Sequence, residues 1–339
     1  MISLKWINDY VDLKDVDLNE LALKVTKAGI NVEKVETTNI DNLVIGKVIK
    51  CIPHPDSDHL KICQVDIKDE ILQIVCGASN VRENLKVIVA KVGAKLCNND
   101  GEIIIKKGKI RNQESNGMIC ALFELGLEEK TKETYDAGIT ELGDDAKIGE
   151  NPIEYLGLDD TIYTLDLNPN RSDCNNHLAF AYEVASVLQK KVKLPSDDYQ
   201  VIDKNINDLF KLEVLTDNCY LYNAKMVTDV KVGESPQFIK NRLEHAGMRS
   251  INNVVDISNY VMLEYGQPLH FFDYDKLGNK ITVRMAYENE EIITLDKQKR
   301  ILSNDDIVIT DSEKPVCIAG VMGGENTEID NNTKTILLL

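Results

Sequence analysis

Long uncharged apolar runs are missing from this 339-residue sequence. No stretch approaches the roughly 18 apolar residues of a membrane-spanning helix, which argues against an integral membrane protein. The start, MISLKWINDYVDL, has neither the basic region nor the apolar core of a secretory signal, so nothing in it predicts export. Hydrophobic residues still make up 43% of the chain, enough for packed cores, and the length predicts two or three domains.

Common nucleotide-binding and catalytic signatures are missing as well. The sequence has no G-x-x-x-x-G-K-S/T phosphate loop, no H-E-x-x-H metal helix and no G-x-S-x-G nucleophile turn. Its glycine-rich stretch AGVMGGE, residues 319–325, does not fit the dinucleotide-binding pattern G-x-G-x-x-G. We therefore expect no ATP-activating site of a familiar kind in this chain.

Positive charge is scarce, with 39 lysines and arginines against 56 acidic residues and a net charge of −17. A surface this acidic repels phosphate, which argues against a general nucleic-acid binder. The exception is residues 40–126, which hold 12 basic and 11 acidic residues. Any contact with a polyanion should lie in this segment, unless the contrast reflects solubility alone.

One short run concentrates the basic residues of that segment. Lys106, Lys107, Lys109 and Arg111 lie within the six residues KKGKIR. As a surface stripe they could contact phosphate groups. Lysines also protect the edge of a sheet from pairing with other chains, and residue type alone leaves both interpretations open.

The eight cysteines are scattered, without a C-x-x-C pair. Thiols in apolar, strand-like runs of a chain without an export signal predict a reducing, cytoplasmic location. Cys51, His54, His59 and Cys63 have a spacing that could ligate zinc. The loop between the histidines is very short and both cysteines fall within strand patterns, so we favour two core thiols and two loop histidines.

Short strands dominate residues 40–126. The segments LVIGKVIKCI, HLKICQVDI, EILQIVCGA, LKVIVAKVGAKL and GEIIIKKGKI follow one another, with turns such as HPDSD and NNDG between them. Five such strands predict a small closed barrel, and the five-stranded oligonucleotide-binding barrel is the natural candidate. Residues 127–160, with 11 acidic residues and three lysines, predict an acidic loop region.

Helical and strand patterns flank that segment. Residues 17–29 predict a capped helix that ends at Gly29, followed by a strand over residues 30–35. After the strand TIYTLDL, a helix capped by Ser172 or Asp173 should run through LAFAYEVASVLQKK, and KLPSDDYQ is a plausible linker.

From about residue 205 the pattern is α+β. One helix should begin at Pro236 and end at Gly247, and a second should span roughly residues 255–265. The strands KITVRMA, EIITLD, DIVIT and VCIAGVMGG follow. The sequence ends in an apolar, strand-like run, TILLL, from which we expect an N-terminal portion of a longer chain.

Two loops of this last region carry polar residues that could act on a ligand. In GQPLHFFD, a proline-stiffened loop holds His270 among apolar neighbours, where a neutral imidazole could orient a water or a substrate hydroxyl. In AGVMGGE, consecutive glycines allow a ligand to approach the backbone, and Glu325 follows them. On residue type alone, a core histidine and a solvated carboxylate are the more common interpretations.

Seven long strings match a known family in the family's own order. They are SLKWINDYVDL, VIGKVIKCIPHPDSDHLKICQVDI, LQIVCGASNVRENLKVIVA, IRNQESNGMICALFELGL, LNPNRSDC, AGMRSINNVVDISNYVMLEYGQPLHFFDYDKL and GVMGGENTEI. From residue 1 to its end, the sequence resembles the β subunit of bacterial phenylalanyl-tRNA synthetase. Two strings depart from the family: CYLY (219–222) lacks its arginine, and NNH (175–177) replaces a more apolar pair.

The resemblance implies an α+β multidomain fold. Residues 1–39 and 150–195 would form a split α/β domain, into which residues 40–149 insert a tRNA-binding barrel of the oligonucleotide-binding type. Residues 205–339 would form an α+β editing domain, truncated at its C-terminal end. ATP and Mg²⁺ would act in the synthetase α subunit, within a heterotetramer of two α and two β subunits. The expected partners are that α subunit and tRNA(Phe), with no membrane.

Editing in this family removes tyrosine wrongly esterified to the phenylalanine tRNA. A site that hydrogen-bonds the tyrosine hydroxyl can discriminate strongly, because phenylalanine would leave its buried polar groups unpaired. By resemblance, Glu325 would accept that hydroxyl, and His270 would lie near the ester and help to place the water. Ester hydrolysis needs little beyond a positioned water and a stabilised oxyanion.

The resemblance implies further site residues. Ser258 and Asn259 would line the pocket, and Arg249 would contact the tRNA 3′ end or the ester region. Three glycines would leave room for the substrate side chain: Gly320, Gly323 and Gly324. We expect no metal or cofactor in this segment. The alternative is a non-catalytic tRNA-binding and subunit-assembly scaffold.

Overall fold

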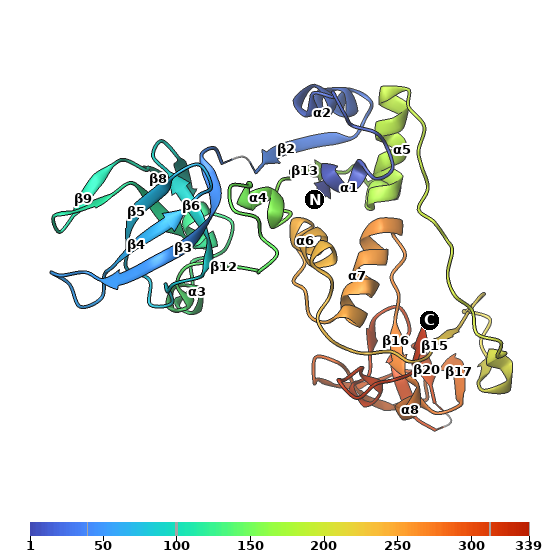
Figure 1. The fold of residues 1–339 in the computed structure, drawn as a ribbon. Helices are drawn as coiled ribbons and strands as arrows, with labels where there is room; N and C mark the ends of the chain where they lie inside the picture. Colours follow the sequence, from blue (N-terminus) through green and yellow to red (C-terminus); the bar gives the residue numbers. More distant parts are fainter. Residues whose placement is uncertain (39, 99–100, 312, 339) are drawn as a thin grey trace. The chain divides into compact units, whose positions relative to one another are not determined.

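The structure is a computed structural model that describes residues 1–38, 40–98, 101–311 and 313–338. The chain forms two compact units, drawn in Figure 1. The first comprises Met1–Glu36 and Thr161–Leu339, and the second comprises Thr37–Asp160. The second unit is therefore an insertion into the first. Over the described residues, no helix is long and apolar enough to cross a membrane.

A three-stranded sheet joins the two ends of the insertion. The elements around it are β1 (Ile2–Ser3), α1 (Leu4–Ile7), α2 (Leu18–Lys27), β2 (Asn31–Thr37), β13 (Thr161–Asp166), η2 (Pro169–Cys174) and α5 (His177–Leu188). The strand order is β1-β13-β2, so the chain leaves the sheet after β2 and returns to it at the neighbouring strand. One core lies between these elements, with Trp6, Tyr163 and Phe180 fully buried.

Local capping explains where the helices of this region begin. The Asp17 side chain accepts hydrogen bonds from two N–H groups of the first turn of α2, as predicted, and Gly29 follows the helix with a left-handed φ of +106°. The predicted cap of α5 is wrong. Asn176 caps this helix, because Ser172 and Asp173 belong to η2, where Asp173 pairs with Arg171.

A buried polar network connects α1 to the helices α6 (Gln237–His245) and α7 (Asn253–Tyr265). The Trp6 indole N–H donates to the Tyr10 hydroxyl (2.8 Å), which in turn donates to the Glu264 carboxylate of α7. The Arg242 guanidinium of α6 lies 4.9 Å from the centroid of the Trp6 ring and pairs with Asp9. Burial raises the pKa of Glu264 above its usual value. These contacts hold the two sequence segments of the first unit together.

His177, which lies in one of the two departures from the family, strengthens the same junction. Its ring stacks on Trp6 with the centroids 4.0 Å apart. The Ser3 N–H donates to Nε2 (3.2 Å), and Nδ1 lies 2.9 Å from the Leu263 carbonyl oxygen. Since Nε2 accepts, the proton resides on Nδ1, which donates to Leu263. The histidine is therefore a neutral bridge between α5, the first strand and α7.

The remainder of the first unit contains two sheets. Its further elements are β14 (Lys211–Val214), β15 (Lys225–Val227), β16 (Phe271–Asp273), α8 (Tyr274–Leu277), β17 (Lys280–Met285), β18 (Glu291–Ile293), β19 (Lys299–Ile301), β20 (Ile307–Thr310), β21 (Pro315–Ile318), β22 (Met322–Gly323) and β23 (Ile336–Leu338). The strand orders are β14-β17-β20-β21-β22 and β15-β23-β16, and β18 pairs with β19. The predicted helices α6 and α7 are confirmed, and β23 is the central strand of its sheet.

The departure at residues 219–222 leaves the packing of this region intact. Cys219 and Tyr222 pack against its core, whereas Tyr220 and Leu221 are 97% and 74% exposed. A side chain that points into solvent makes no contact with the core, so the missing arginine disturbs no buried contact.

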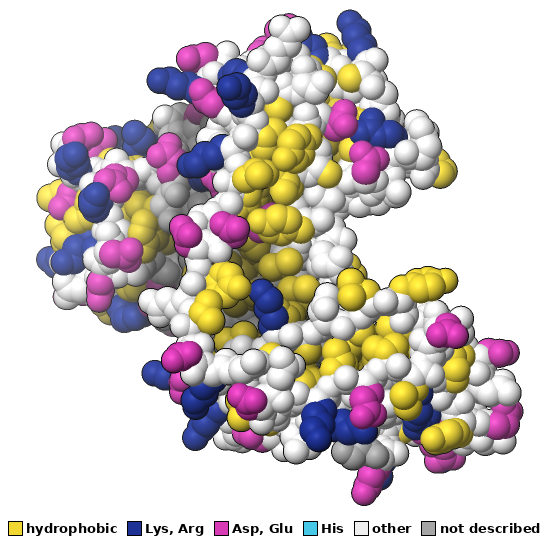
Figure 2. Space-filling view, turned by 90° about the vertical axis from the view of Figure 1, so that its right-hand side faces the viewer, with side chains coloured by type: hydrophobic (Ala, Val, Ile, Leu, Met, Phe, Trp, Pro, Cys, Tyr) yellow, Lys and Arg dark blue, Asp and Glu magenta, His cyan; other side chains and the backbone are white. Residues whose placement is uncertain are grey.

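Figure 2 shows that hydrophobic side chains gather on the displayed face of the molecule, among scattered charged ones.

The second unit is built on one six-stranded sheet. Its strands are β3 (Leu43–Pro53), β4 (Lys61–Asp66), β5 (Ile71–Cys76), β6 (Lys86–Lys91), β11 (Gly117–Cys120) and β12 (Glu141–Leu142). The order is β11-β6-β3-β4-β5, and β12 also pairs with β6. The Val75 N–H donates to Ser115 Oγ, and the Asn116 N–H donates to the Gln73 carbonyl. The segment before β11 therefore meets the free edge of β5, and the sheet is nearly closed.

This sheet departs in detail from the predicted five strands. The run LKVIVAKVGAKL divides at Gly93, whose φ is +94°, and GEIIIKKGKI divides at residues 105–107. The pieces form two hairpins beside the main sheet, β7 (Lys95–Asn98) with β8 (Gly101–Ile104) and β9 (Gly108–Ile110) with β10 (Gln113–Ser115). The acidic region predicted as a loop also contains the short helices α3 (Lys132–Ala137) and α4 (Pro152–Tyr155).

Replacing Tyr10 by phenylalanine should destabilise the first unit. The variant leaves the buried Trp6 N–H and the Glu264 carboxyl group without the hydroxyl, which should lower the free energy of unfolding by about 1–3 kcal/mol. Urea unfolding followed by the fluorescence of the single tryptophan measures this decrease. Tyr182→Phe removes an exposed hydroxyl from α5 and is the matched control. Equal decreases in both variants would contradict the role of the network.

Candidate functional site

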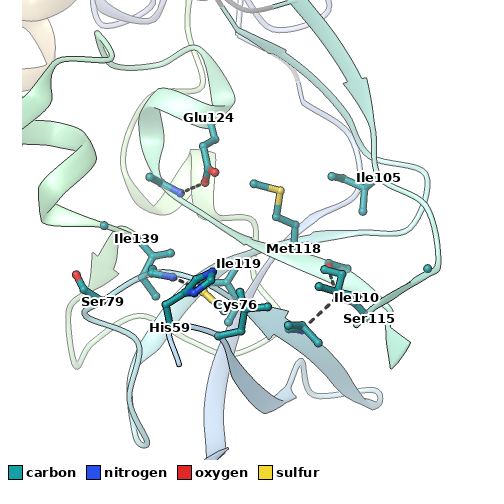
Figure 3. A pocket seen from close by; sticks show the side chains of 18 of the residues that line it. His59, Cys76, Ser79, Ile105, Ile110, Ser115, Met118, Ile119, Glu124 and Ile139 are labelled. Atoms are coloured by element: carbon teal, nitrogen blue, oxygen red, sulfur yellow. Dashed lines mark hydrogen bonds between the residues drawn. The ribbon is translucent and has the colours of Figure 1, made fainter. Parts of the chain in front are cut away.

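A groove of about 800 Å³ lies in the second unit (Figure 3). Apolar side chains form much of its wall, among them Ile105, Met118, Ile119 and Ile139. Its polar residues include His59, Ser115 and Glu124. The combination of an apolar floor with polar groups at intervals suits a ligand that has both flat apolar faces and hydrogen-bonding edges.

Positive charge borders this groove. Lys106 and Lys109 line it and are exposed to solvent. Glu124 also lines it, and its carboxylate accepts a hydrogen bond from the Ala121 N–H (2.8 Å). Burial raises the pKa of Glu124, so its environment disfavours the negative charge. The lining of the groove therefore combines two lysines with two acidic residues, Glu124 and Asp136, and is close to neutral.

The four predicted basic residues separate into two pairs. Lys106 and Lys109 line the groove. Lys107 instead lies 3.9 Å from the Glu114 carboxylate, and Arg111 donates to the Asp56 carbonyl oxygen (2.5 Å). Lys107 and Arg111 therefore support the β9–β10 hairpin, which carries Lys109.

The Cys-His-His-Cys pattern does not converge on one point. The Asp56 N–H donates to Nδ1 of His54 (3.0 Å), and Nε2 of the same ring lies 3.3 Å from the Ile110 carbonyl oxygen. Backbone groups therefore occupy both ring nitrogens of His54. His59 is exposed and pairs with Asp58. The two thiols, Cys51 and Cys63, lie together inside the sheet with their sulfur atoms 3.7 Å apart.

Among the described residues, one group of metal-capable side chains does cluster, at Asp173, Cys174 and Glu183. The Arg171 guanidinium lies among them, 3.0 Å from Asp173 and 2.7 Å from Glu183. This arginine lowers the pKa of Asp173 to about 2. The cationic position is thus filled by a side chain of the protein, which does not fit a magnesium site.

In the first unit, the two candidate loops meet through His270 and Gly323. A Cβ atom on Gly323 would lie 2.4 Å from Cε1 and 2.7 Å from Nε2 of the His270 ring, so only glycine fits there. The Phe272 ring also packs edge-on against the imidazole, with the two ring centroids 4.4 Å apart. Burial lowers the pKa of His270 below its usual value. The structure therefore holds a neutral imidazole against the glycine loop.

Of the other predicted residues, Ser258 bonds to the loop that carries His270. The Ser258 hydroxyl of α7 donates to the Leu269 carbonyl oxygen (2.9 Å), which fixes the backbone immediately before His270. Asn259 follows it in α7 and is half-buried, whereas Arg249 is exposed on the loop between α6 and α7. Ser258 is therefore connected to the His270 loop by a direct hydrogen bond.

The sequence analysis missed one important residue of this region. Asp256 is completely buried and accepts hydrogen bonds from the Ser235 and Ser250 hydroxyls (2.5 Å each) and from the Ile251 N–H (2.8 Å). These bonds fix the loop that carries Arg249. Its position in the first turn of a helix, where a carboxylate is favourable, was the available signal.

The glycine loop leads directly to Glu325. Gly320 adopts a left-handed φ of +69°, and a Cβ on Gly324 would lie 2.9 Å from the Val316 carbonyl oxygen. Glu325 begins the short helix η4 (Glu325–Thr327) and is exposed. The glycines therefore shape the turn and admit the His270 ring, while the carboxylate of Glu325 faces solvent.

Two family models match the regions that contain the groove and the His270 loop. The family model of the tRNA binding domain matches residues 43–151, which include the groove. The family model of the B3/4 domain matches residues 218–339, which include His270 and Glu325. The two family models therefore match the barrel-like sheet of the second unit and most of the α+β region of the first unit.

The curated relatives that the chain resembles include β subunits of phenylalanine–tRNA ligase. The chain is 48% identical, over 99% of its residues, to the phenylalanine–tRNA ligase β subunits of Bacillus cereus (strain ZK / E33L) and Bacillus subtilis (strain 168). It is 45% identical to the β subunit of Fusobacterium nucleatum, in an alignment that covers 100% of this chain. The chain spans 42% of the length of each of these relatives. The resemblance to the β subunit of phenylalanyl-tRNA synthetase is therefore confirmed over nearly the whole chain.

Solved structures show partial similarity. An N-terminal fragment of the phenylalanyl-tRNA synthetase β-subunit from Pyrococcus horikoshii aligns with 53% of this chain and 55% of its own, at a TM-score of 0.32 and 17% identity. A MetRS related protein from the same organism aligns with 32% of this chain and 84% of its own, at a TM-score of 0.23 and 20% identity.

The half-buried position of His270, packed against Phe272, predicts its titration. Its imidazole should protonate with a midpoint below the ordinary value of about 6.5, because burial disfavours the charged ring. The unfolded chain then binds more protons than the folded one, so stability should fall as the pH drops below about 6.5. NMR titration of the imidazole Cε1–H signals, with His270→Gln to assign the resonance, measures the midpoint. A midpoint at or above 6.5 would contradict the buried placement.

Proposed function

We propose that this chain forms part of the β subunit of a phenylalanine–tRNA ligase and has two tasks. It binds tRNA through the groove of the second unit, and it hydrolyses tyrosine misattached to tRNA(Phe) in the domain of residues 205–339. Phenylalanylation, with ATP and Mg²⁺, takes place in the α subunit of a cytoplasmic heterotetramer of two α and two β subunits. The domain boundaries at 1–39, 40–149 and 150–195 belong to the same proposal.

The contact between His270 and Gly323 carries the editing proposal. It unites two loops that lie 53 residues apart in the sequence and that both belong to the B3/4 match. A neutral imidazole can accept a hydrogen bond from water and orient it toward an ester carbonyl. The hydrogen bond from Ser258 to Leu269 supports this geometry, because it limits the movement of the loop.

We assign recognition of the substrate to the other predicted site residues. Glu325 follows the glycine loop and offers a carboxylate that can accept the tyrosine hydroxyl. Arg249, on the loop fixed by Asp256, offers a guanidinium for the phosphates of the tRNA 3′ end. Asn259 adds an amide on the same helix as Ser258, and Gly320 and Gly324 shape the turn before Glu325.

The exposure of Glu325 favours the second candidate function, a tRNA-binding and subunit-assembly scaffold without hydrolysis. Water competes for an exposed carboxylate, so a hydrogen bond to it discriminates less between tyrosine and phenylalanine than a hydrogen bond to a buried acceptor would. Activity measurements on this chain therefore separate the two candidates.

The 339-residue chain should deacylate tyrosyl-tRNA(Phe) and spare phenylalanyl-tRNA(Phe). Glu325→Gln should lower the rate with the tyrosyl ester by about 10-fold or more, because the glutamine amide is a weaker hydrogen-bond acceptor for the tyrosine hydroxyl than the carboxylate. Glu328→Gln changes an exposed carboxylate three residues further on and should leave the rate unchanged. Release of radiolabelled tyrosine measures the reaction. No hydrolysis by the folded chain, or equal effects of both variants, would favour the scaffold.

The groove predicts the effect of lysine substitutions on tRNA binding. Lys106→Ala with Lys109→Ala should weaken binding and flatten its salt dependence, by about 0.7–0.9 in slope for each phosphate that the variant no longer neutralises. Filter binding of tRNA(Phe) at several salt concentrations measures both quantities. The control removes two exposed lysines of the first unit, Lys14 and Lys27, which leaves the net charge matched. Equal weakening in the two double variants would indicate a general charge effect and contradict the groove.

A further inference from the structure

Two thiols face each other across neighbouring strands of the second unit. Cys51 in β3 is the direct register partner of Cys63 in β4. The Cys63 thiol donates toward Cys51 Sγ over 3.7 Å. Cys63 is completely buried, whereas Cys51 is half-buried. The pair thus combines an interior thiol with one that solvent and small molecules can reach.

The hydrogen bonds of the strands define the type of this pair. The Cys51 N–H donates to the Glu83 carboxylate (3.2 Å) and so points away from β4. Three residues on, the His54 N–H donates to the Leu60 carbonyl oxygen (3.0 Å). Hydrogen-bonded and non-hydrogen-bonded pairs alternate along antiparallel strands, which makes Cys51 and Cys63 a non-hydrogen-bonded pair.

This type of pair brings side chains close enough for a covalent bond. The Cα atoms of a non-hydrogen-bonded pair lie about 4.5 Å apart, within the range of about 4.4–6.8 Å that disulfides span. The sulfur atoms must then approach from 3.7 Å to about 2.05 Å, which rotation of the side chains can supply. The backbone of the sheet needs no rearrangement for this.

We propose that Cys51 and Cys63 form a reversible disulfide with each other across the two strands. The oxidant is a low-molecular-weight disulfide such as oxidised glutathione. The Cys51 thiolate attacks one sulfur of that molecule, forms a mixed disulfide and releases one small thiol. Cys63 then loses its proton and attacks the Cys51 sulfur, which forms the protein disulfide and releases the second small thiol. Two protein thiols are oxidised and one small disulfide is reduced to two thiols.

The neighbouring cysteines explain why this pair is selected. Cys76 of β5 stands opposite Lys61 rather than Cys63 in the strand register, and Cys63 stands opposite Ile74. Burial raises the pKa of Cys63, which disfavours its thiolate and makes it the less reactive thiol of the pair. The half-buried Cys51 is therefore the first to react, and the buried Cys63 resolves the mixed disulfide.

The disulfide would close a short loop that contains the HPDSD turn. Cys51 Sγ also lies 3.9 Å from the Val81 carbonyl oxygen, in the loop that follows the groove residues Gly77, Ala78 and Ser79. A covalent link at this place reduces the freedom of the unfolded chain and should raise the melting temperature of the second unit by several degrees.

The sequence allows a direct test. Trypsin cuts after Lys50, Lys61 and Lys68, so Cys51 and Cys63 fall in separate peptides, CIPHPDSDHLK and ICQVDIK. The folded chain is treated with oxidised glutathione, its remaining thiols are blocked with N-ethylmaleimide, and the unreduced digest is analysed by mass spectrometry. We expect one species with the summed mass of both peptides less two hydrogens, which dithiothreitol separates. The melting temperature should rise on oxidation and return on reduction.

Variants supply the controls. Cys51→Ser and Cys63→Ser should each abolish the linked species and the rise in melting temperature. Cys219→Ser removes a half-buried thiol of the first unit and should leave both unchanged. Glutathione that persists on Cys51, a link from Cys63 to Cys76, or no link in the folded wild-type chain would each overturn the proposal. The peptide map of the wild type decides the question even if a variant fails to fold.

Discussion

The stacking of the Arg242 guanidinium on Trp6 is the contact on which the first unit depends. The half-buried guanidinium of Arg242 is partly removed from water, and the Asp9 carboxylate and the aromatic rings around it compensate for this loss. This arrangement fixes α6 and α7 against the start of the chain. From α7, Ser258 holds the loop that leads to His270. The candidate hydrolytic site is therefore positioned by residues from the first ten positions of the sequence.

The charge of the second unit contrasts with that of the chain as a whole. Residues 40–126 are nearly neutral, while the chain as a whole carries −17. Under the proposed function, the acidic remainder would repel a polyanion, and Lys106 and Lys109 would make the groove a favoured place of contact. Two of the basic residues, Lys107 and Arg111, bind within the protein and hold the hairpin in shape. The short run KKGKIR thus contains both the lysines that line the groove and two residues that contact other groups of the second unit.

Local rules of sequence predicted the helices well and the sheets less well. The cap at Asp17 and the helix ends at Gly247 and Gly266 depend on a few neighbouring residues, and all three were predicted correctly. The division of an apolar run at Gly93 depends on which strand the chain meets next, which no local pattern contains. The cap of α5 was misplaced because Arg171 engages Asp173 first, an interaction that also involves a residue on the helix itself.

The candidate site divides in the same way between local and non-local information. Resemblance located His270 and Glu325, but the steric fit between the imidazole and Gly323 appears only when two different sheets place β16 and β22 together. The position of Asp256 in the first turn of α7 was a local signal, but its burial and its bonds to the Ser235 and Ser250 hydroxyls are visible only in the folded chain. Glu325 sets the last constraint. Its carboxylate faces water, so selection for a hydroxyl requires that the bound tRNA end, or another part of the protein, exclude that water during hydrolysis.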